Sequence, residues 1–449
     1  MDTIHIRQGR NIKIKGAASK EIAAAPLPSK VGVYPSDFRG MHWRPVVKEG
    51  DAVKVGAPLL EDKAHPQIKI VSPASGRVSA VNRGEKRVLL SIVVDTDGRQ
   101  EAAVHAKYSP DQLRSLSRDN VIQQLLVSGV WACIRQRPFS RIASLSDTPK
   151  SIFVRAMSTD PLALDVDFVL QGREQEFQAG LDILCKLTKG DVHVCCDAKA
   201  SSRALTQARN VKIHGFSGPH PAGNISTHIH YVDPVRKGDI VWYLGAEDVL
   251  RIAALFTRGV FSPERIVAVA GEGVDRRVYL KTVIGAPVSS LVGGRVKESL
   301  RYISGSVLSG ASVGPNGFLG FYDTQLTVIP EGGKRRFLGW ITPGFGSYSF
   351  SKTFASSFLP DREVALDTDT NGSERAVVLN EVYDAYVPLD IMTFFLMRAV
   401  IAGDIEEAEN LGILECDEED FALCTFACPS KVDVGGIIRG GLDLIEKEG

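Results

Sequence analysis

Two cysteines near the carboxyl end of the chain have a spacing that could ligate iron. Cys424 and Cys428 are separated by three residues and followed by proline, as in the second half of the C-x2-C-x2-C-x3-C-P run that binds iron–sulfur clusters. Phe421 and Glu418 stand where the first two ligands belong, and Cys416 is out of register. Two interpretations remain: a buried helix in which thiols pack as small hydrophobes, or the remnant of a cluster domain without its cofactor.

Three histidines come nearest to a metal-binding set. His228 and His230 are two residues apart, which would place both on one face of a strand, and His220 precedes them by eight residues. A zinc site needs three or four ligands with supporting groups behind them, and the neighbouring sequence does not complete such a set. We expect a polar strand face or the lining of a pocket.

The segment GVWACIRQRPFSR, residues 129–141, combines aromatic and cationic side chains. It contains Trp131, Arg135, Arg137 and Phe139, and we expect it to cross the carboxyl edge of a sheet. An aromatic and basic lining suits a planar, oxygen-bearing ligand such as a quinone or a flavin. The alternative is that the aromatic residues pack a core while the arginines pair with acids.

Loops that would bind a nucleotide are missing from the sequence. Gly271 and Gly273 follow an apolar run, but Arg276 stands where a dinucleotide loop needs its third glycine, and strand-like residues follow. The letters around Ser312 match a nucleophile elbow, yet Pro-Asn-Gly follows and cannot start the helix that this motif needs. Neither motif supports catalysis by this chain.

The composition indicates a globular protein of several domains and argues against nucleic acid as a partner. The 449 residues are 44% hydrophobic and 24% charged, and 53 basic residues balance 53 acidic ones. Seven cysteines, an odd number that includes an adjacent pair, indicate a reducing compartment. The most apolar stretch, residues 387–403, is interrupted by Asp390 and Arg398, so we expect a buried helix there and no transmembrane helix.

The elements that would position these residues fall into four regions, which together predict a multidomain α/β and α+β fold. Residues 1–105 predict a barrel of the biotinyl/lipoyl carrier type with an N-terminal strand. Residues 106–262 alternate helix and strand, which predicts a Rossmann-like, doubly wound domain that lacks the flavin/NADH glycine loop. Residues 263–333 predict a β-grasp module, and residues 334–449 a mostly helical domain.

Local signals add detail. A helix should begin after the capping residue Ser109, and two later helices should end at Gly190 and Gly259. The first fifteen residues alternate isoleucine with basic side chains, as exposed edge strands do. Residues 404–420 carry nine acids and no base, which is typical of a solvated face, although such a run could dock on a basic partner.

This combination of parts resembles the A subunits of the sodium-translocating NADH:quinone oxidoreductases, the NqrA family. The resemblance covers nearly the whole chain and is strongest in five stretches: EDKAHPQIKIVSPASGRVSAVNRGEKRVLLSIVVD, SGVWACIRQRPFSRI, SGPHPAGNISTHIHYVDPV, YISGSVLSG and CDEEDFALCTFACPSK. It implies that the β-grasp is of the SLBB type. The Rnf complex C subunit and the flavin subunit of complex I share the architecture, but here Trp131 and Ile134 occupy the place of their glycine loop, and Cys424 and Cys428 are the remnant of their cluster motif.

The resemblance implies a peripheral subunit on the cytoplasmic face of the bacterial inner membrane, bound to the other subunits and to a membrane subunit in particular. NADH, flavins, iron–sulfur clusters and sodium passage would belong to those partners. This chain would hold no cofactor or metal and would not be catalytic in isolation. Ubiquinone would contact the vacated flavin region, and the expected site residues are Trp131, Arg135, Arg137, Phe139, Met157 and, nearby, His220. The alternatives are a purely structural assembly subunit and an independent NADH/flavin-binding redox subunit.

Overall fold

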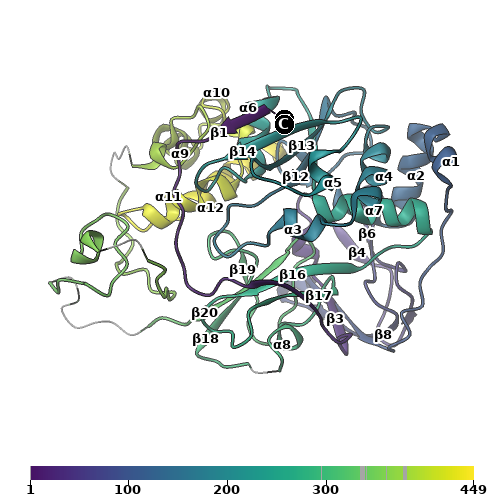
Figure 1. Cartoon of the computed structure of the whole chain (residues 1–449), viewed down its shortest axis with the longest axis horizontal. Coiled ribbons are helices and arrows are strands. Elements are labelled where there is room, and N and C mark those ends of the chain that lie inside the picture. Colours follow the sequence, from purple (N-terminus) through teal and green to yellow (C-terminus); the bar gives the residue numbers. More distant parts are fainter. Residues whose placement is uncertain are drawn as a thin grey trace.

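The computed structural model describes residues 2–294, 296–333, 339, 341–359, 362–377 and 382–448. Figure 1 shows strands and helices packed into several layers, with the amino-terminal strands β3 and β8 at the lower right and the carboxyl-terminal helices at the upper left. The described strands form sheets of seven, six, four and three strands. The predicted multidomain α/β character is therefore confirmed.

Between residues 30 and 96 of the predicted barrel region, the strands form two small antiparallel sheets. Gly50 and Gly56 adopt φ angles of 91° and 83° at turns, a conformation that glycine reaches without strain. The four-stranded sheet contains β3 (Lys30–Val33), β9 (Leu89–Thr96), β8 (Gly76–Arg83) and β5 (Ala52–Val53); the three-stranded sheet contains β4 (Trp43–Pro45), β6 (Pro58–Asp62) and β7 (Lys69–Val71). Short 3-10 helices η1 (Pro35–Asp37) and η2 (Glu85–Arg87) join them.

The seven-stranded sheet is parallel at its centre and has helices on both faces. Its order is β1 (Asp2–His5), β14 (Lys212–Ser217), β13 (Val192–Asp197), β12 (Ser151–Ala156), β15 (Val241–Gly245), β10 (Arg135–Arg137) and β11 (Arg141–Ile142). The flanking helices are α1 (Pro110–Ser115), α2 (Arg118–Val127), η3 (Val130–Cys133), α3 (Val166–Leu170), α4 (Glu174–Leu184), α5 (Arg203–Thr206), α6 (Ile225–Val232) and α7 (Ala246–Arg258). On β12, Ile152 and Val154 pack into the core on one face, and Phe153 packs into a separate core with α6 residues on the other.

The helix signals of this region are correct in part. Ser109 forms a full capping box with Gln112, but the helix divides into α1 and α2, and α7 ends at Gly259 as predicted. The other predicted end is wrong, because α4 ends at Leu184 and not at Gly190. The strand predicted for His228 and His230 is also wrong: both lie on α6, whose buried residues Ile225 and Ile229 follow the helical period of four.

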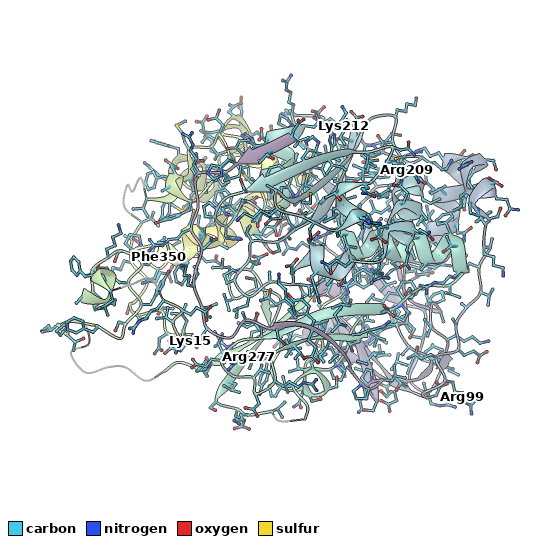
Figure 2. The ribbon with its side chains drawn as sticks, viewed as in Figure 1. Lys15, Arg99, Arg209, Lys212, Arg277 and Phe350 are labelled. Atoms are coloured by element: carbon cyan, nitrogen blue, oxygen red, sulfur yellow. The ribbon has the colours of Figure 1, made fainter. Side chains whose placement is uncertain are left out.

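The N-terminal strand pairs outside the barrel region to which the sequence assigned it. β1 lies parallel to β14 at the edge of the seven-stranded sheet, so the edge position is confirmed for residues 2–5, whereas residues 6–15 leave that sheet. Ile6, Ile12 and Ile14 are buried. Figure 2 places Phe350 in the carboxyl-terminal part, and there the Arg10 guanidinium lies 4.4 Å from the centre of its ring. The amino-terminal segment therefore connects the seven-stranded sheet to the carboxyl-terminal part of the chain around Phe350.

The six-stranded sheet is mixed and carries one short helix, while its assignment as a β-grasp stays a prediction. Its order is β19 (Ala311–Ser312), β18 (Leu300–Ser304), β20 (Gln325–Pro330), β16 (Glu264–Ala270), β17 (Val278–Val283) and β2 (Ser19–Ala24); the helix is α8 (Val288–Leu291). β2 comes from the predicted barrel region and pairs with β17 because the chain crosses between sheets before residue 30.

The carboxyl-terminal region is helical from residue 383 onward. Its elements are η5 (Tyr383–Ala385), α9 (Thr393–Ala402), α10 (Ile405–Asn410), η6 (Ile413–Glu415), η7 (Glu418–Phe421), α11 (Ala422–Ala427) and α12 (Val434–Glu448). Between residues 339 and 377 the described residues contain a single helix, η4 (Ala355–Phe358); the predicted domain start at residue 334 lies outside the described residues. Within the described ranges, every helix is too short or too polar to span a membrane.

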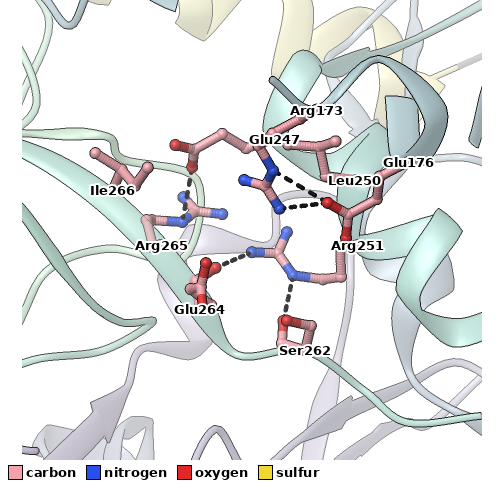
Figure 3. A pocket seen from close by; sticks show the side chains of 9 residues that line it. All are labelled: Arg173, Glu176, Glu247, Leu250, Arg251, Ser262, Glu264, Arg265 and Ile266. Atoms are coloured by element: carbon pink, nitrogen blue, oxygen red, sulfur yellow. Dashed lines mark hydrogen bonds and ion pairs between the residues drawn. The ribbon is translucent and has the colours of Figure 1, made fainter. Parts of the chain in front are cut away.

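A buried cluster of charges joins α7 to β16 of the six-stranded sheet (Figure 3). Arg251 pairs with Asp248 on α7, and Arg265 on β16 lies 3.6 Å from Asp248 and 3.8 Å from Glu247. The cluster borders a cavity of about 20 Å³, room for about one water molecule. A buried charge that loses its partner destabilises the fold. Replacement of either an acidic or a basic residue of the cluster should therefore lower the free energy of unfolding.

Replacement of Arg265 tests this dependence. Arg265→Met leaves Asp248 and Glu247 with less compensation, and we expect the free energy of unfolding to fall by about 3–5 kcal/mol. The matched control is Arg301→Met, which removes the exposed pair with Glu331 and should cost less than about 1 kcal/mol. Urea unfolding followed by circular dichroism measures both; equal losses would contradict the assigned role of the cluster.

Candidate functional site

Strand β10 presents two arginines on one face of the seven-stranded sheet. β10 runs antiparallel to β15, with Arg135 opposite Tyr243 and Arg137 opposite Val241. Gln136 between them faces the other way and accepts a hydrogen bond from the Ser144 amide at 2.7 Å. The expectation that this segment crosses the carboxyl edge of the sheet is wrong, because it is itself a strand paired alongside β15.

Arg135 lies between two tyrosine rings. Its guanidinium carbon is 4.6 Å from the centre of the Tyr243 ring and 4.4 Å from that of Tyr322, which comes from the loop before β20. The Tyr322 hydroxyl donates to the Ala132 carbonyl at 2.7 Å, which fixes this ring. The Nε atom of Arg135 is buried and has no hydrogen-bond acceptor among the described residues. The charge of Arg135 is thus stabilised by two aromatic faces, and its Nε–H group can still donate a hydrogen bond.

Arg137 is almost fully buried and is also incompletely paired. It is 1% exposed, and its Nη2 lies 3.2 Å from Asp417 Oδ2 and 3.8 Å from Glu419 Oε1. None of its three guanidinium nitrogens makes a hydrogen bond of acceptable geometry within the described part of the chain. A buried donor that makes no hydrogen bond destabilises the folded protein. A ligand oxygen that accepted a hydrogen bond from Arg137 would remove this penalty.

The acids that face Arg137 belong to the end of the acidic run, the turn of residues 417–420. The prediction of a solvated face is wrong for this end: Asp417 is 7% exposed and Asp420 is 2% exposed. Asp417 pairs with Arg439 of α12 and accepts a hydrogen bond from Ser140 at 2.5 Å, while Glu418 pairs with Arg39. The turn is therefore tied to the α/β sheet, to α12 and to the segment after η1.

An ionic chain continues from this turn to His220. Glu419 lies 3.9 Å from Arg155 at the end of β12, Arg155 lies 3.0 Å from Asp160, and Asp160 lies 3.9 Å from the buried His220. The Thr159 hydroxyl is 3.2 Å from Nδ1 of His220. Two of the predicted site residues, Arg137 and His220, are thus connected by a chain of charged side chains. The residues of this chain come from distant parts of the sequence.

Burial and neighbouring charges set the protonation of this network. Burial raises the pKa of Asp417, but Arg137, Arg439 and Arg39 outweigh it and hold that pKa well below its ordinary value. Burial raises the pKa of Asp420 to about 7 and raises the pKa of Glu419. Burial also lowers the pKa of His220. The network therefore combines one acid whose pKa is lowered with two acids whose pKa values are raised.

The remaining predicted site residues lie in packed cores. Trp131 is 1% exposed, its indole nitrogen donates to the Ala143 carbonyl at 2.9 Å, and it meets Trp242 edge to face. Met157 is buried with α6 residues, and Phe139 packs against the core of the carboxyl-terminal helices. Trp131 and Phe139 pack, and Arg137 pairs with acids, as the alternative interpretation describes; Met157, which that interpretation did not include, is also buried.

Sequence reasoning missed several residues of the site. Asp417, Glu419, Tyr243, Tyr322 and Arg155 come from separate parts of the chain. The one available signal was the complementary charge of RQR at 135–137 and DEED at 417–420.

The amino-terminal segment covers the loop that follows β14. The Ile6 and Arg10 amides donate at 2.8 Å to the carbonyls of Ser217 and His220, and the His220 amide donates to Asn11 Oδ1 at 2.9 Å. Gly9 has a φ of 118°, and a β-carbon there would stand 2.0 Å from the His220 carbonyl oxygen. Open α/β sheets usually bind ligands at the carboxyl ends of their parallel strands. In this chain the amino-terminal segment lies at the carboxyl end of β14.

The cysteines of the half motif lie in the core of the carboxyl-terminal helices. The Tyr383 hydroxyl is 3.1 Å from the sulfur of Cys428, and the Cys424 thiol donates to the Tyr383 carbonyl at 3.6 Å. Burial raises the pKa of Cys424 and of Cys416, which disfavours the thiolate form that metals bind. Over the described ranges, no three His, Cys, Asp or Glu side chains are grouped to hold a metal ion.

A larger cavity, of about 420 Å³, lies on the surface beside α2. Ile122, Leu126 and Leu145 supply its apolar wall, and Arg118 and Gln67 lie at its polar side. Arg118 already donates to the carbonyls of Leu187 and Asp147, so its guanidinium is engaged. This cavity is an alternative place for an apolar ligand.

Comparison with known proteins identifies the family. Residues 4–97 match the NqrA N-terminal barrel-sandwich hybrid domain, residues 116–261 the NqrA second alpha/beta domain, and residues 266–314 the NQRA C-terminal domain. A solved NAD+-reducing NiFe hydrogenase matches with a TM-score of 0.39 and 13% identity over 77% of this chain and 66% of that chain.

The curated relatives that match are Na(+)-translocating NADH-quinone reductase subunits A. Those of Yersinia pseudotuberculosis serotype O:1b and Pasteurella multocida are 42% and 43% identical, and that of Neisseria meningitidis serogroup B is 40% identical. Each match covers 99% of this chain and 100% of the relative. The chain therefore belongs to the NqrA family, the A subunits of the Na(+)-translocating NADH-quinone reductases.

Proposed function

We propose that this chain is a peripheral subunit of a Na(+)-translocating NADH-quinone reductase that carries no redox centre and binds the head group of a quinone at Arg135 and Arg137. The observation that supports this proposal most strongly is the set of buried guanidinium nitrogens on β10 that make no hydrogen bond to any residue the structure describes. A quinone offers two carbonyl oxygens on a planar ring, which matches donors placed beside aromatic faces.

The geometry suits a ligand whose charge changes. The oxygens of a quinone become more negative on reduction, and positively charged donors beside them stabilise that form. Tyr243 and Tyr322 flank Arg135 and offer ring faces. The pKa of Asp420, raised by burial to about 7, places an acid that can exchange a proton close to Arg137. In this proposal Trp131 and Met157 support the site from the cores and do not contact the ligand.

The proposal assigns NADH oxidation, flavins, iron–sulfur clusters and sodium passage to other subunits, with this chain on the cytoplasmic face of the inner membrane. Two features support the assignment. Cys424 and Cys428 pack around Tyr383, and the amino-terminal segment lies over the His220 loop. The chain would bind and position quinone at the acceptor end and contribute to assembly.

A purely structural subunit is the second candidate, and the acidic turn favours it. Residues 417–420 connect Arg39, Arg137 and Arg439 from three parts of the chain, which an assembly role alone would explain. The two candidates differ in whether the isolated chain binds quinone.

Quinone titration separates them. Arg135→Gln removes a cation that faces the proposed ligand, and we expect a short-chain ubiquinone to bind about tenfold more weakly than to the wild type. Arg301→Gln, on the exposed surface of β18, is the matched control and should leave the affinity unchanged. Tryptophan fluorescence quenching measures both affinities. Equal affinity of Arg135→Gln and the wild type would remove this site.

A second test concerns redox centres. The purified chain should show no absorption band near 450 nm and no stoichiometric iron, because the thiols of Cys416, Cys424 and Cys428 are buried and the sequence lacks a glycine loop for flavin phosphate. Visible spectroscopy and metal analysis of protein purified without oxygen provide the measurement. Recovery of yellow pigment or of iron in a one-to-one ratio would support an independent redox subunit instead.

The raised pKa of Asp420 predicts a pH-dependent stability. Between its ordinary value of 3.8 and about 7, the folded chain holds a proton on Asp420 that the unfolded chain has released. The free energy of unfolding contributed by this group is therefore largest at low pH and declines as pH rises through that window. Arg137 opposes the raised pKa, and Glu419 and Asp417 add to it.

Asp420→Asn should abolish this contribution. Relative to the wild type, the variant should become progressively more stable between pH 4 and pH 7, as measured by urea unfolding at several pH values. Glu406→Gln, at an exposed position, serves as the control and should follow the wild type. A constant difference between Asp420→Asn and the wild type across this range would show that Asp420 stays ionised.

A further inference from the structure

Residues 341–359, which we call the aromatic loop, expose large apolar side chains. Four of them lie close together in sequence and are 60%, 60%, 91% and 41% exposed, namely Ile341, Phe345, Phe358 and Leu359. Phe358 is the most exposed large hydrophobic side chain among the described residues. Single exposed apolar residues are common, whereas several on one short loop indicate a surface that another molecule covers.

Hydrogen bonds hold the two arms of this loop together. The Ala355 amide donates to the Pro343 carbonyl at 2.9 Å, and the Arg362 guanidinium donates to the Phe345 carbonyl at 2.7 Å. The arm that carries Phe345 and the arm that carries Phe358 are therefore parts of one folded unit, and their exposed side chains can act together.

One aromatic residue of the loop fixes it to the rest of the chain. The centre of the Phe350 ring lies 5.2 Å from that of Phe426 on α11 and 5.3 Å from that of Tyr386, and the Arg10 guanidinium covers the same ring. Figure 1 shows the chain between β20 and α9 extending at the left, away from the sheets. The loop is thus attached at Phe350, while its other aromatic side chains include the exposed Phe345 and Phe358.

The sequence around the aromatic loop is basic. Residues 332–360 contain four Lys or Arg and no Asp or Glu, and seven of these 29 residues are aromatic. Lys352 lies in the loop itself and is exposed. Exposed acids resume with Glu363, next to Val364, which pairs with Ile14 of the amino-terminal segment. The acids therefore begin where the chain returns to the body of the protein.

We propose that the aromatic loop inserts into the headgroup region of an anionic lipid bilayer. The inference rests on the proposed role as a peripheral subunit, which places the chain beside a membrane. Segments that combine exposed Phe, Leu or Ile with Lys and Arg bind at the surface of anionic bilayers, because the apolar groups leave water while the cations lie at the lipid phosphates. A groove on another protein is the competing occupant.

Co-sedimentation with vesicles tests this contact. The purified full-length chain is titrated with phosphatidylglycerol vesicles and with phosphatidylcholine vesicles, and it should bind the anionic vesicles at least about tenfold more tightly. The double variant Phe345→Ser/Phe358→Ser should bind phosphatidylglycerol at least about tenfold more weakly than the wild type. Lys352→Glu should also weaken this binding, by a factor that shrinks as NaCl increases.

The matched control is Val104→Ser/Val127→Ser, which removes apolar side chains that are 83% and 60% exposed elsewhere on the molecule. It should bind the vesicles within about twofold of the wild type. Thermal unfolding of each variant establishes that these surface changes leave the fold intact. Since Lys352→Glu keeps every apolar side chain of the loop, it provides an independent test if the serine variant is unstable.

Two results would overturn the inference while leaving the proposed function in place. One is that the wild type does not bind phosphatidylglycerol vesicles, or binds them no more tightly than both test variants. The other is that the serine variant binds vesicles normally but binds the detergent-purified remainder of the complex more weakly, which would assign the loop to a protein partner. A wild-type chain that does not bind the remainder of the complex at all would contradict the proposed function itself.

Discussion

The contact between the buried arginines of β10 and the acidic turn of residues 417–420 is the constraint on which the rest of the structure depends. A guanidinium group that is 1% exposed, as Arg137 is, needs negative partners nearby. Asp417 and Glu419 supply them, and Arg39 and Arg439 bind the same turn. One short turn therefore holds three parts of the chain together, and its charges leave donors on β10 free.

Two places where a nucleotide or an iron–sulfur cluster would need free protein groups are filled by side chains and backbone of this chain. The amino-terminal segment lies over the loop that contains His220, and the half motif of cysteines is sealed around Tyr383. Backbone groups of the loop that contains His220 and the thiols of Cys424 and Cys428 are thereby engaged within the protein. Arg135 and Arg137 both lie against the ring of Tyr243, and this is where we propose that quinone binds.

Local patterns predicted the elements better than their partners. The cap at Ser109 and the end of α7 at Gly259 depend on neighbouring residues, so the sequence indicates them. The pairing of β1 with β14 and the burial of Asp417 against Arg137 join residues more than two hundred positions apart, which no local pattern encodes. His228 was misassigned because a spacing of two fits a strand face, whereas the isoleucines around it follow a helical period. In the site, the sequence identified the arginines but not their acids and tyrosines.

The central claim is that Arg135 and Arg137 of strand β10 bind the head group of a quinone. The most direct measurement is to illuminate the assembled complex with a photoreactive quinone and to map the labelled peptide of this chain by mass spectrometry. The account predicts label within residues 131–141 or on Tyr243 or Tyr322, reduced by competing ubiquinone. Label confined to the α2 cavity around Ile122 and Leu126, or absent from this chain while partner subunits are labelled, would contradict it.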